Sequence, residues 1–152
     1  MPLLNSLTII LGSLCGLAIA GYIHRKKVAG AKLVCPIGTD CQAVIYSRYS
    51  KFLEIPVENL GVFYYLLTAL SYTLLLFFPN GNTESFSFAI LALTTVAFIF
   101  SLYLLFVQII VLRRWCTWCL GSAILCTIIF ISVWSVSSLN LVSFINSIIN
   151  NF

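Results

Sequence analysis

The chain has 152 residues, of which 61% are hydrophobic and only 8% are charged. A soluble domain of this size needs more charged side chains than this to cover its core. The composition therefore excludes a soluble globular protein. The length allows one domain, residues 1–152. We therefore expect an all-α integral membrane protein, because a membrane-spanning barrel would need many more strands.

Four segments contain no Asp, Glu, Lys or Arg and reach the about 20 residues that a helix needs to cross a bilayer. They are residues 3–23, 60–78, 86–112 and 115–134. A sequence resembling a signal-peptide cleavage site precedes Gly21, but the basic cluster Arg25 to Lys27 follows the apolar stretch, which favours an uncleaved anchor. The tail, residues 135–152, is predicted to be an interfacial segment into which the last helix frays.

The connections between these segments differ greatly in length. Residues 24–59 form the only long loop, and Arg113 and Arg114 form a short turn between the third and fourth segments. Simple alternation of four spans puts this loop and this turn on the same face of the membrane. Four of the six cysteines are also on that face. The other two, Cys15 and Cys126, lie within apolar segments and are interpreted as small buried hydrophobic residues.

Cys116 and Cys119 form a C-x-x-C pair at the expected start of the fourth helix. The unpaired amides and the positive end of the helix dipole favour a thiolate there, and Arg113 and Arg114 add positive charge. The spacing also puts both sulfurs on one side of the helix. This arrangement is typical of a redox-active dithiol.

Cys35 and Cys41 form a second pair across a turn with Pro and Gly. Thr39 and Gln42 have the spacing of a capping box, and a short amphipathic helix is predicted to follow, with Cys41 in its first turn. The apolar residues that define this helix repeat at helical intervals: Val44, Ile45, Tyr49, Phe52 and Leu53. Two pairs on one face suggest a redox relay. The alternatives are that the four cysteines are structural staples of a membrane scaffold or together bind one zinc ion.

The order of these landmarks resembles the vitamin K epoxide reductase family in its bacterial form, over roughly residues 5–135. The matching landmarks are Cys35-Pro36-Ile37-Gly38-Thr39-Asp40-Cys41, Ser47 to Phe52, Ile55-Pro56-Val57, Leu60-Gly61 and Trp115-Cys116-Thr117-Trp118-Cys119. The resemblance implies a four-helix bundle that encloses a quinone, with the long loop over one end. It also implies that the protein reoxidises a thioredoxin-fold partner, which introduces disulfides into secreted proteins.

Residue by residue, the resemblance makes Cys116 and Cys119 the active-site pair, with Cys119 nearest the quinone. Cys35 and Cys41 become the shuttle pair that meets the partner, and electrons pass through a Cys41–Cys116 disulfide. The expected electron acceptor is a quinone of the ubiquinone or menaquinone type. Many relatives carry a fused thioredoxin-like domain; this chain is expected to be a stand-alone form with a separate partner.

Two positions depart from the vertebrate pattern, in which a Tyr after the C-x-x-C pair and an Asn near the second helix hold the quinone. Here they align with Ala123 and Val57, with Glu58 and Asn59 as neighbours. Simple quinone reduction is therefore the predicted reaction, rather than reduction of vitamin K epoxide. We expect Asn59, together with Trp118 between the two cysteines, to contact the quinone.

Other notable side chains receive simpler interpretations. Trp115, Tyr64 and Tyr65 could stack on a quinone ring, but aromatic residues near helix ends are more often anchors at the membrane interface, which is the interpretation we prefer. The cluster from His24 to Lys27 is predicted to face lipid headgroups. Gln108 is a strongly polar side chain deep in the third segment, where it contacts either a neighbouring helix or the ligand.

The orientation signals oppose each other. All eight Lys and Arg residues lie on the cysteine face, which by the positive-inside rule indicates the cytosol. Disulfide formation, however, belongs in an oxidising compartment. We predict a cell-membrane protein with its cysteine face outside the cytoplasm, with lipid and a thioredoxin-fold protein as partners and neither nucleic acid nor a metal ion bound.

Overall fold

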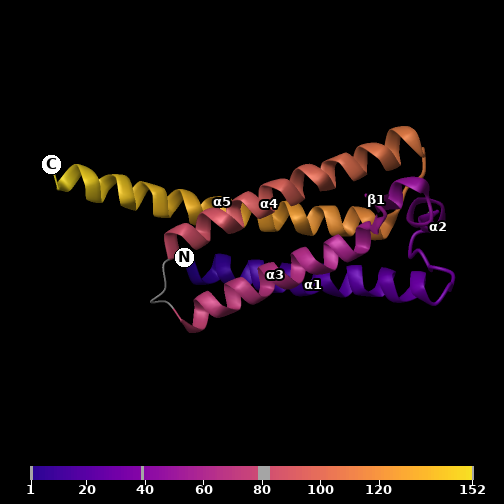
Figure 1. Ribbon diagram of the computed structural model, residues 1–152, viewed down its shortest axis with the longest axis horizontal. Helices are drawn as coiled ribbons and strands as arrows, with labels where there is room; N and C mark the ends of the chain where they lie inside the picture. The colour runs from indigo at the N-terminus through magenta and orange to yellow at the C-terminus, as the bar shows by residue number, and fades with distance from the viewer. Residues whose placement is uncertain (1, 39, 79–82, 152) are drawn as a thin grey trace.

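A computed structural model describes residues 2–38, 40–78 and 83–151. Within these residues, four helices are long and apolar enough to cross a membrane, as predicted. They are α1 (Pro2–Val28), α3 (Val57–Phe77), α4 (Thr83–Phe106) and α5 (Thr117–Asn150). They run lengthwise through the molecule, and the long loop lies at the end where α4 turns into α5 (Figure 1). The predicted fold, a four-helix membrane bundle with a loop over one end, is confirmed.

The helices do not pack evenly against one another. α1 packs along both α3 and α5, and α5 also packs along α4, whereas α3 and α4 touch each other little. At the centre, the ring of Tyr65 on α3 lies against Gly16 on α1. Its hydroxyl donates to the carbonyl oxygen of Ser122 on α5 at 2.9 Å and lies 2.8 Å from the Ser122 Oγ. Tyr65 thus holds α1, α3 and α5 together. α4 packs on α5 instead, so the contact between α3 and α4 stays small.

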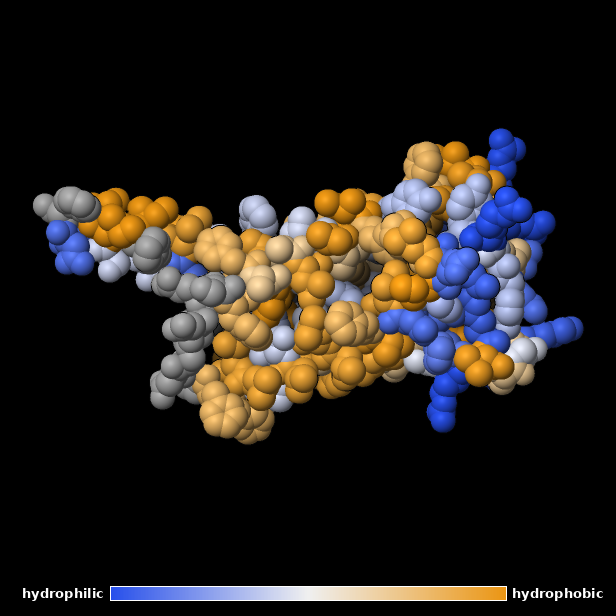
Figure 2. All heavy atoms as spheres, in the orientation of Figure 1, coloured by the Kyte–Doolittle hydropathy of each residue, from blue (hydrophilic) through white to orange (hydrophobic). Residues whose placement is uncertain are grey.

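The outer surface of the helices is apolar. Large hydrophobic side chains are exposed on all four, among them Leu11, Phe63, Ile99 and Ile131. Hydrophobic residues cover the length of the bundle, and hydrophilic residues gather at the loop end (Figure 2). Such a surface requires lipid around it, so the chain is a multi-pass membrane protein.

The ends of the helices differ from the predicted segments. α1 continues to Val28 and therefore carries the basic cluster on its last turn. α4 is followed by one turn of π-helix, η2 (Val107–Val111), in which the Leu112 N–H donates to the Val107 carbonyl at 2.9 Å. Arg113 then takes a positive φ of 50°, which reverses the chain toward α5.

The prediction that the tail frays was wrong. α5 continues as a regular helix to Asn150. Its 34 residues give a length of about 50 Å, longer than the about 30 Å of hydrocarbon. Ser135 and Ser138 donate to the carbonyls of Ile131 and Trp134, so their hydroxyls do not compete with the helix. The end of α5 projects beyond the other helices (Figure 1).

The long loop contains less helix than predicted. α2 spans only Cys41–Ile45, with Cys41 in its first turn as expected, and η1 (Arg48–Ser50) is a 3₁₀ turn. The strands β1 (Lys51–Phe52) and β2 (Ile55–Pro56) form an antiparallel hairpin, so the helical interpretation of Phe52 and Leu53 was wrong. Leu53 and Glu54 have φ of 51° and 67°, the left-handed conformation of a tight hairpin turn. Asp40 is the N-cap of α2, and the proposed cap residue Thr39 lies outside the described residues.

The contact between α1 and Tyr65 leads to a prediction about stability. Gly16→Ala should destabilise the protein by roughly 1–3 kcal/mol, because the added Cβ would overlap the Tyr65 ring and displace it from Ser122. Thermal denaturation in detergent measures this change. Gly21→Ala is the matched control on the same helix, since nothing lies within 4 Å of the Cβ it would add. Equal stability of the two variants would contradict the proposed packing.

Candidate functional site

The C-x-x-C pair lies at the N-terminus of α5, as predicted. Cys116 is the N-cap residue, and its Sγ accepts a hydrogen bond from the backbone N–H of Cys119 at 3.3 Å. Cys116 is completely buried, whereas Cys119 is partly exposed. A hydrogen bond from the Cys119 side chain, together with the N–H groups of Cys119 and Trp118, lowers the pKa of Cys116 against the opposing effect of burial. The thiolate of Cys116 is therefore favoured.

Arg114 has a different role from the one the sequence indicated. Its guanidinium forms an ion pair with Asp40 at 2.8 Å, between the turn before α5 and the residue before Cys41. On the other side of the C-x-x-C pair, the Trp118 Nε1 donates to the Val34 carbonyl at 3.1 Å. Each contact joins a residue in or near the C-x-x-C pair to a residue next to a cysteine of the loop pair. They hold the long loop against the start of α5.

Cys35 and Cys41 are joined by a disulfide, with their Cα atoms 6.1 Å apart. Cys41 is buried, with 1% of its surface exposed, whereas Cys35 is partly exposed. Cys41 and Cys116 belong to the same buried cluster, which also contains Ile23 and Ile45. The structure therefore places the inner cysteine of the loop pair together with the N-cap cysteine of α5.

An apolar cavity of about 480 Å³ lies next to Cys119. It is bounded by α1, α3, α4, α5 and the loop, on the side where α3 and α4 touch little. Among the four cysteines of the two pairs, the described lining includes Cys119 alone. Its wall is formed mainly by aliphatic and aromatic residues, including Ile19, Leu60, Phe63, Leu93, Val96, Phe100 and Leu104. The volume and the apolar lining are typical of a site for a small organic molecule.

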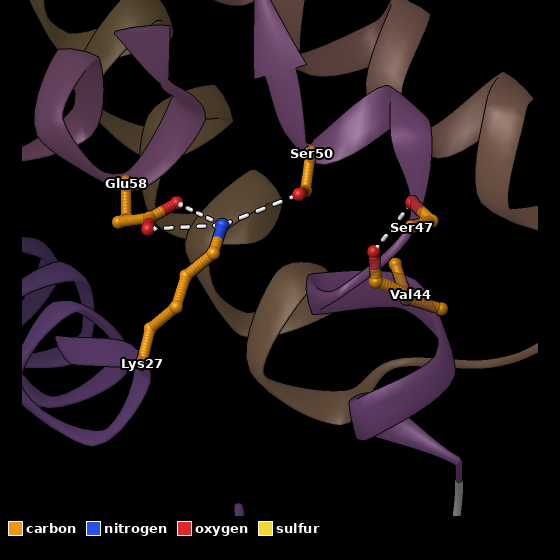
Figure 3. A network of polar contacts seen from close by, with 5 residues as sticks. All are labelled: Lys27, Val44, Ser47, Ser50 and Glu58. Atoms are coloured by element: carbon orange, nitrogen blue, oxygen red, sulfur yellow. Dashed lines mark hydrogen bonds and ion pairs between the residues drawn. The ribbon is translucent and has the colours of Figure 1, made fainter. Parts of the chain in front are cut away.

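A buried charged network borders this cavity (Figure 3). The Lys27 Nζ lies 3.1 Å from the Glu58 Oε1 and donates to the Glu58 Oε2 and the Ser50 Oγ, each at 3.2 Å. Glu58 and Ser50 line the cavity. The side chains of Lys27 and Glu58 are 14% and 6% exposed, so the interpretation of Lys27 as a headgroup contact was wrong. From the sequence, Glu58 was named only as a neighbour of Val57, although its charge near the start of an apolar helix was a usable signal.

Two tyrosines and one glutamine also reach the cavity. Tyr64 and Tyr65 are buried in its wall, so their interpretation as interface anchors was wrong. Gln108, in η2, lines the cavity with only 2% of its surface exposed. Its Nε2 has no hydrogen-bond partner among the described residues. A buried donor left without a partner costs roughly 1–3 kcal/mol, so this group calls for an explanation.

The two predicted quinone contacts do not line the cavity. Trp118 packs against Tyr22, with ring centroids 5.1 Å apart, and binds the loop as described above. Asn59 is exposed, one residue along α3 from Glu58. Their contact with a quinone therefore stays a prediction that the geometry does not favour. Cys126 is buried in the cavity wall, whereas Cys15 is exposed on the outside of α1 and not buried as expected.

Metal binding has no structural counterpart in the described part of the chain. No three His, Cys, Asp or Glu side chains gather there into a group that could hold a metal ion. The disulfide between Cys35 and Cys41 also removes two of the four thiolates that a zinc site would need.

The chain matches the sequence profile of the vitamin K epoxide reductase family over residues 7–134. It belongs to that family. No curated protein matches the chain significantly. Membership in the vitamin K epoxide reductase family makes the protein a membrane oxidoreductase that works through cysteines, and family members generally use quinones. Both cysteine pairs and the cavity residues lie within the matched region.

The hydrogen bonds to Cys116 lead to a prediction about pH. Because its pKa is lowered, the thiolate should persist below the pH at which an ordinary cysteine becomes protonated. Cys119→Ala removes the first of these hydrogen bonds and should move the midpoint to higher pH. The measurement is the thiolate absorbance near 240 nm as a function of pH, with Cys116→Ser as the blank. An unchanged midpoint in Cys119→Ala would contradict the assigned cause.

Proposed function

We propose that this protein is a membrane thiol:quinone oxidoreductase that reoxidises a thioredoxin-fold protein and reduces a membrane quinone. The observation that carries the proposal is the position of Cys119. It belongs to the C-x-x-C pair at the N-terminus of α5 and also lines the apolar cavity. Electrons that reach the pair thus have an exit toward a lipid-soluble acceptor.

The proposed relay balances electrons and protons. A partner thiolate attacks Cys35, and the second partner thiol releases the reduced Cys35–Cys41 pair while the partner leaves as a disulfide. The Cys41 thiolate then attacks Cys116 of an oxidised Cys116–Cys119 pair and displaces Cys119. Attack of Cys35 on Cys41 frees Cys116 and restores the loop disulfide. The dithiol of Cys116 and Cys119 finally gives two electrons and two protons to the quinone, which leaves as a hydroquinone.

The surroundings of each cysteine fit its proposed role. Cys35 is partly exposed and is flanked by the exposed apolar side chains of Val34 and Ile37, which suit contact with a protein partner. Cys41 and Cys116 share a buried cluster, which suits a disulfide between the loop and α5. The cavity beside Cys119 has the size and apolar character that a ubiquinone or menaquinone head group requires.

The second candidate function is a non-catalytic scaffold in which the cysteines are structural staples. The disulfide between Cys35 and Cys41 is compatible with it. A staple, however, needs neither a favoured thiolate at Cys116 nor a cavity that reaches Cys119. The oxidoreductase explains both features, so we favour it.

For the location we propose the cell membrane, with the cysteine face outside the cytoplasm. Disulfide formation requires a compartment in which thiols are not continually reduced. Of the basic residues on this face, Lys27 is paired with Glu58 inside the bundle and Arg114 is paired with Asp40. Both therefore have structural roles, which weakens the argument from the positive-inside rule.

The relay predicts different effects for the two pairs. Cys119→Ala should lower quinone reduction to the rate without protein, whether the reductant is a reduced thioredoxin-fold protein or dithiothreitol. Cys35→Ala should block the protein reductant but leave reduction by dithiothreitol largely intact, because a small dithiol reaches Cys116 and Cys119 directly. The assay follows loss of a ubiquinone or menaquinone analogue spectrophotometrically.

Cys15→Ala is the control for this assay, since Cys15 lies on the outside of α1 and should keep full activity. Equal losses for Cys35→Ala and Cys119→Ala with both reductants would refute the relay. Wild-type protein that reduces no quinone with either reductant would favour the scaffold.

The proposed orientation predicts which cysteines a membrane-impermeant maleimide reaches in intact, reduced cells. A variant that retains Cys35 alone should be labelled without lysis. The control is a cysteine-free chain carrying Asn150→Cys, because the end of α5 lies far from the loop, at the opposite end of the molecule (Figure 1). It should be protected until lysis. The reverse pattern would place the cysteine face in the cytosol.

A further inference from the structure

Gln108 is a polar residue of the cavity that the cysteine relay does not explain. Only 2% of its surface is exposed, the wall around it is otherwise mostly apolar, and its Nε2 meets no acceptor among the described residues. Natural proteins rarely bury an amide donor in this way unless a ligand or water supplies the acceptor. The side chain is therefore a candidate contact for whatever occupies the cavity.

The backbone explains why the Gln108 side chain faces the cavity. Phe100, Leu104 and Gln108 follow one another at intervals of four residues along α4 and η2, and all three line the cavity. The Gln108 carbonyl accepts from the Arg114 N–H at 3.1 Å, and Arg114 is in turn paired with Asp40. The main chain of Gln108 is thus fixed by the turn before α5. Single turns of π-helix such as η2 are frequent at functional sites.

Several other polar groups of the cavity already have partners. Lys27 and Glu58 bind each other and Ser50. The Tyr65 hydroxyl contacts Ser122, whereas the buried Tyr64 hydroxyl, like the Gln108 Nε2, has no hydrogen-bond partner among the described residues.

Resting on the quinone reductase function proposed above, we propose that the Gln108 amide donates a hydrogen bond to a carbonyl oxygen of the quinone. Gln108 would then be a specificity-determining residue that selects a ring bearing a carbonyl over an apolar molecule of the same shape. An N–H donor in an apolar wall discriminates well, because it stays unpaired when the ligand has no acceptor. The same contact would orient the head group within reach of Cys119.

The test compares two probes that share a ring system and a methyl group, 2-methyl-1,4-naphthoquinone and 2-methylnaphthalene, which lacks both carbonyls. Affinities are measured by calorimetry on the full chain in detergent. Gln108→Leu should weaken binding of the quinone by about three- to tenfold, whereas the affinity for 2-methylnaphthalene should stay unchanged or rise. With dithiothreitol as reductant, the KM for the quinone should rise by a similar factor and kcat should change less.

A stability measurement separates this role from a structural one. Because the Gln108 Nε2 has no hydrogen-bond partner among the described residues, Gln108→Leu should melt at the same temperature as the wild type or higher. The matched control is Thr94→Val, which removes a different fully buried polar group, on α4. The Thr94 hydroxyl donates to the Ile90 carbonyl within the helix and lies outside the cavity lining, so its loss should not affect quinone binding.

Gln108→Met, which keeps an unbranched side chain of similar length, serves as the second variant if Gln108→Leu does not fold. Equal losses of affinity for the two probes would overturn the proposal, because Gln108 would then only shape the cavity. Unchanged quinone affinity in a folded variant would overturn it as well. Failure of the proposed function itself looks different, since wild-type protein would then reduce no quinone and would not prefer the quinone to 2-methylnaphthalene.

Discussion

The close packing of α1 against α3 and α5 is the constraint on which the rest of the structure depends. In lipid, helices gain nothing from burying apolar surface against each other, so they associate through close contacts and hydrogen bonds. Gly16 allows the Tyr65 ring to lie against α1, and the Tyr65 hydroxyl reaches Ser122 on α5. Since α4 packs on α5 and touches α3 little, the same arrangement leaves the cavity open along α3 and α4. The packing that holds the bundle together thus also determines where a ligand can enter.

The second constraint is electrostatic and acts at the loop end of the cavity. A lysine and a glutamate buried alone would be costly, but as a pair with a hydroxyl partner they satisfy each other. Lys27 comes from the end of α1, Glu58 from the start of α3 and Ser50 from the loop, so the network joins three segments at one point (Figure 3). Arg114 and Asp40 join the loop to the turn before α5 in a more exposed position. Together these contacts hold the cysteine-bearing loop over the bundle.

Sequence alone could predict the spans, because runs without charge reveal membrane helices by length. It could also place Cys116 and Cys119 at a helix start, and the order of the cysteine, Ile-Pro-Val and Leu-Gly landmarks indicated the family. It could not predict that Lys27 turns inward, since a basic cluster after an apolar run looks the same whether its members face headgroups or a buried carboxylate. Trp118 was predicted to contact the quinone ring because it lies between Cys116 and Cys119. Its orientation instead depends on Tyr22 and the Val34 carbonyl, which are distant in sequence. The hairpin after η1 was missed because Leu53 and Glu54 carry no sequence mark of left-handed turns.

The two cysteines of the C-x-x-C pair differ in their surroundings, and the difference gives the proposed relay its direction. Cys116 is the N-cap of α5, where backbone N–H groups stabilise its thiolate, and it shares a buried cluster with Cys41. Cys119, one turn later, lines the cavity that Cys116 does not reach. A protein partner in water and a quinone in lipid would never need to meet, because the partner would contact the loop pair, Cys41 would reach Cys116, and only Cys119 would face the quinone. Cys116 and Cys119 lie within a single turn at the N-terminus of α5, so this pair could connect the loop disulfide to the cavity.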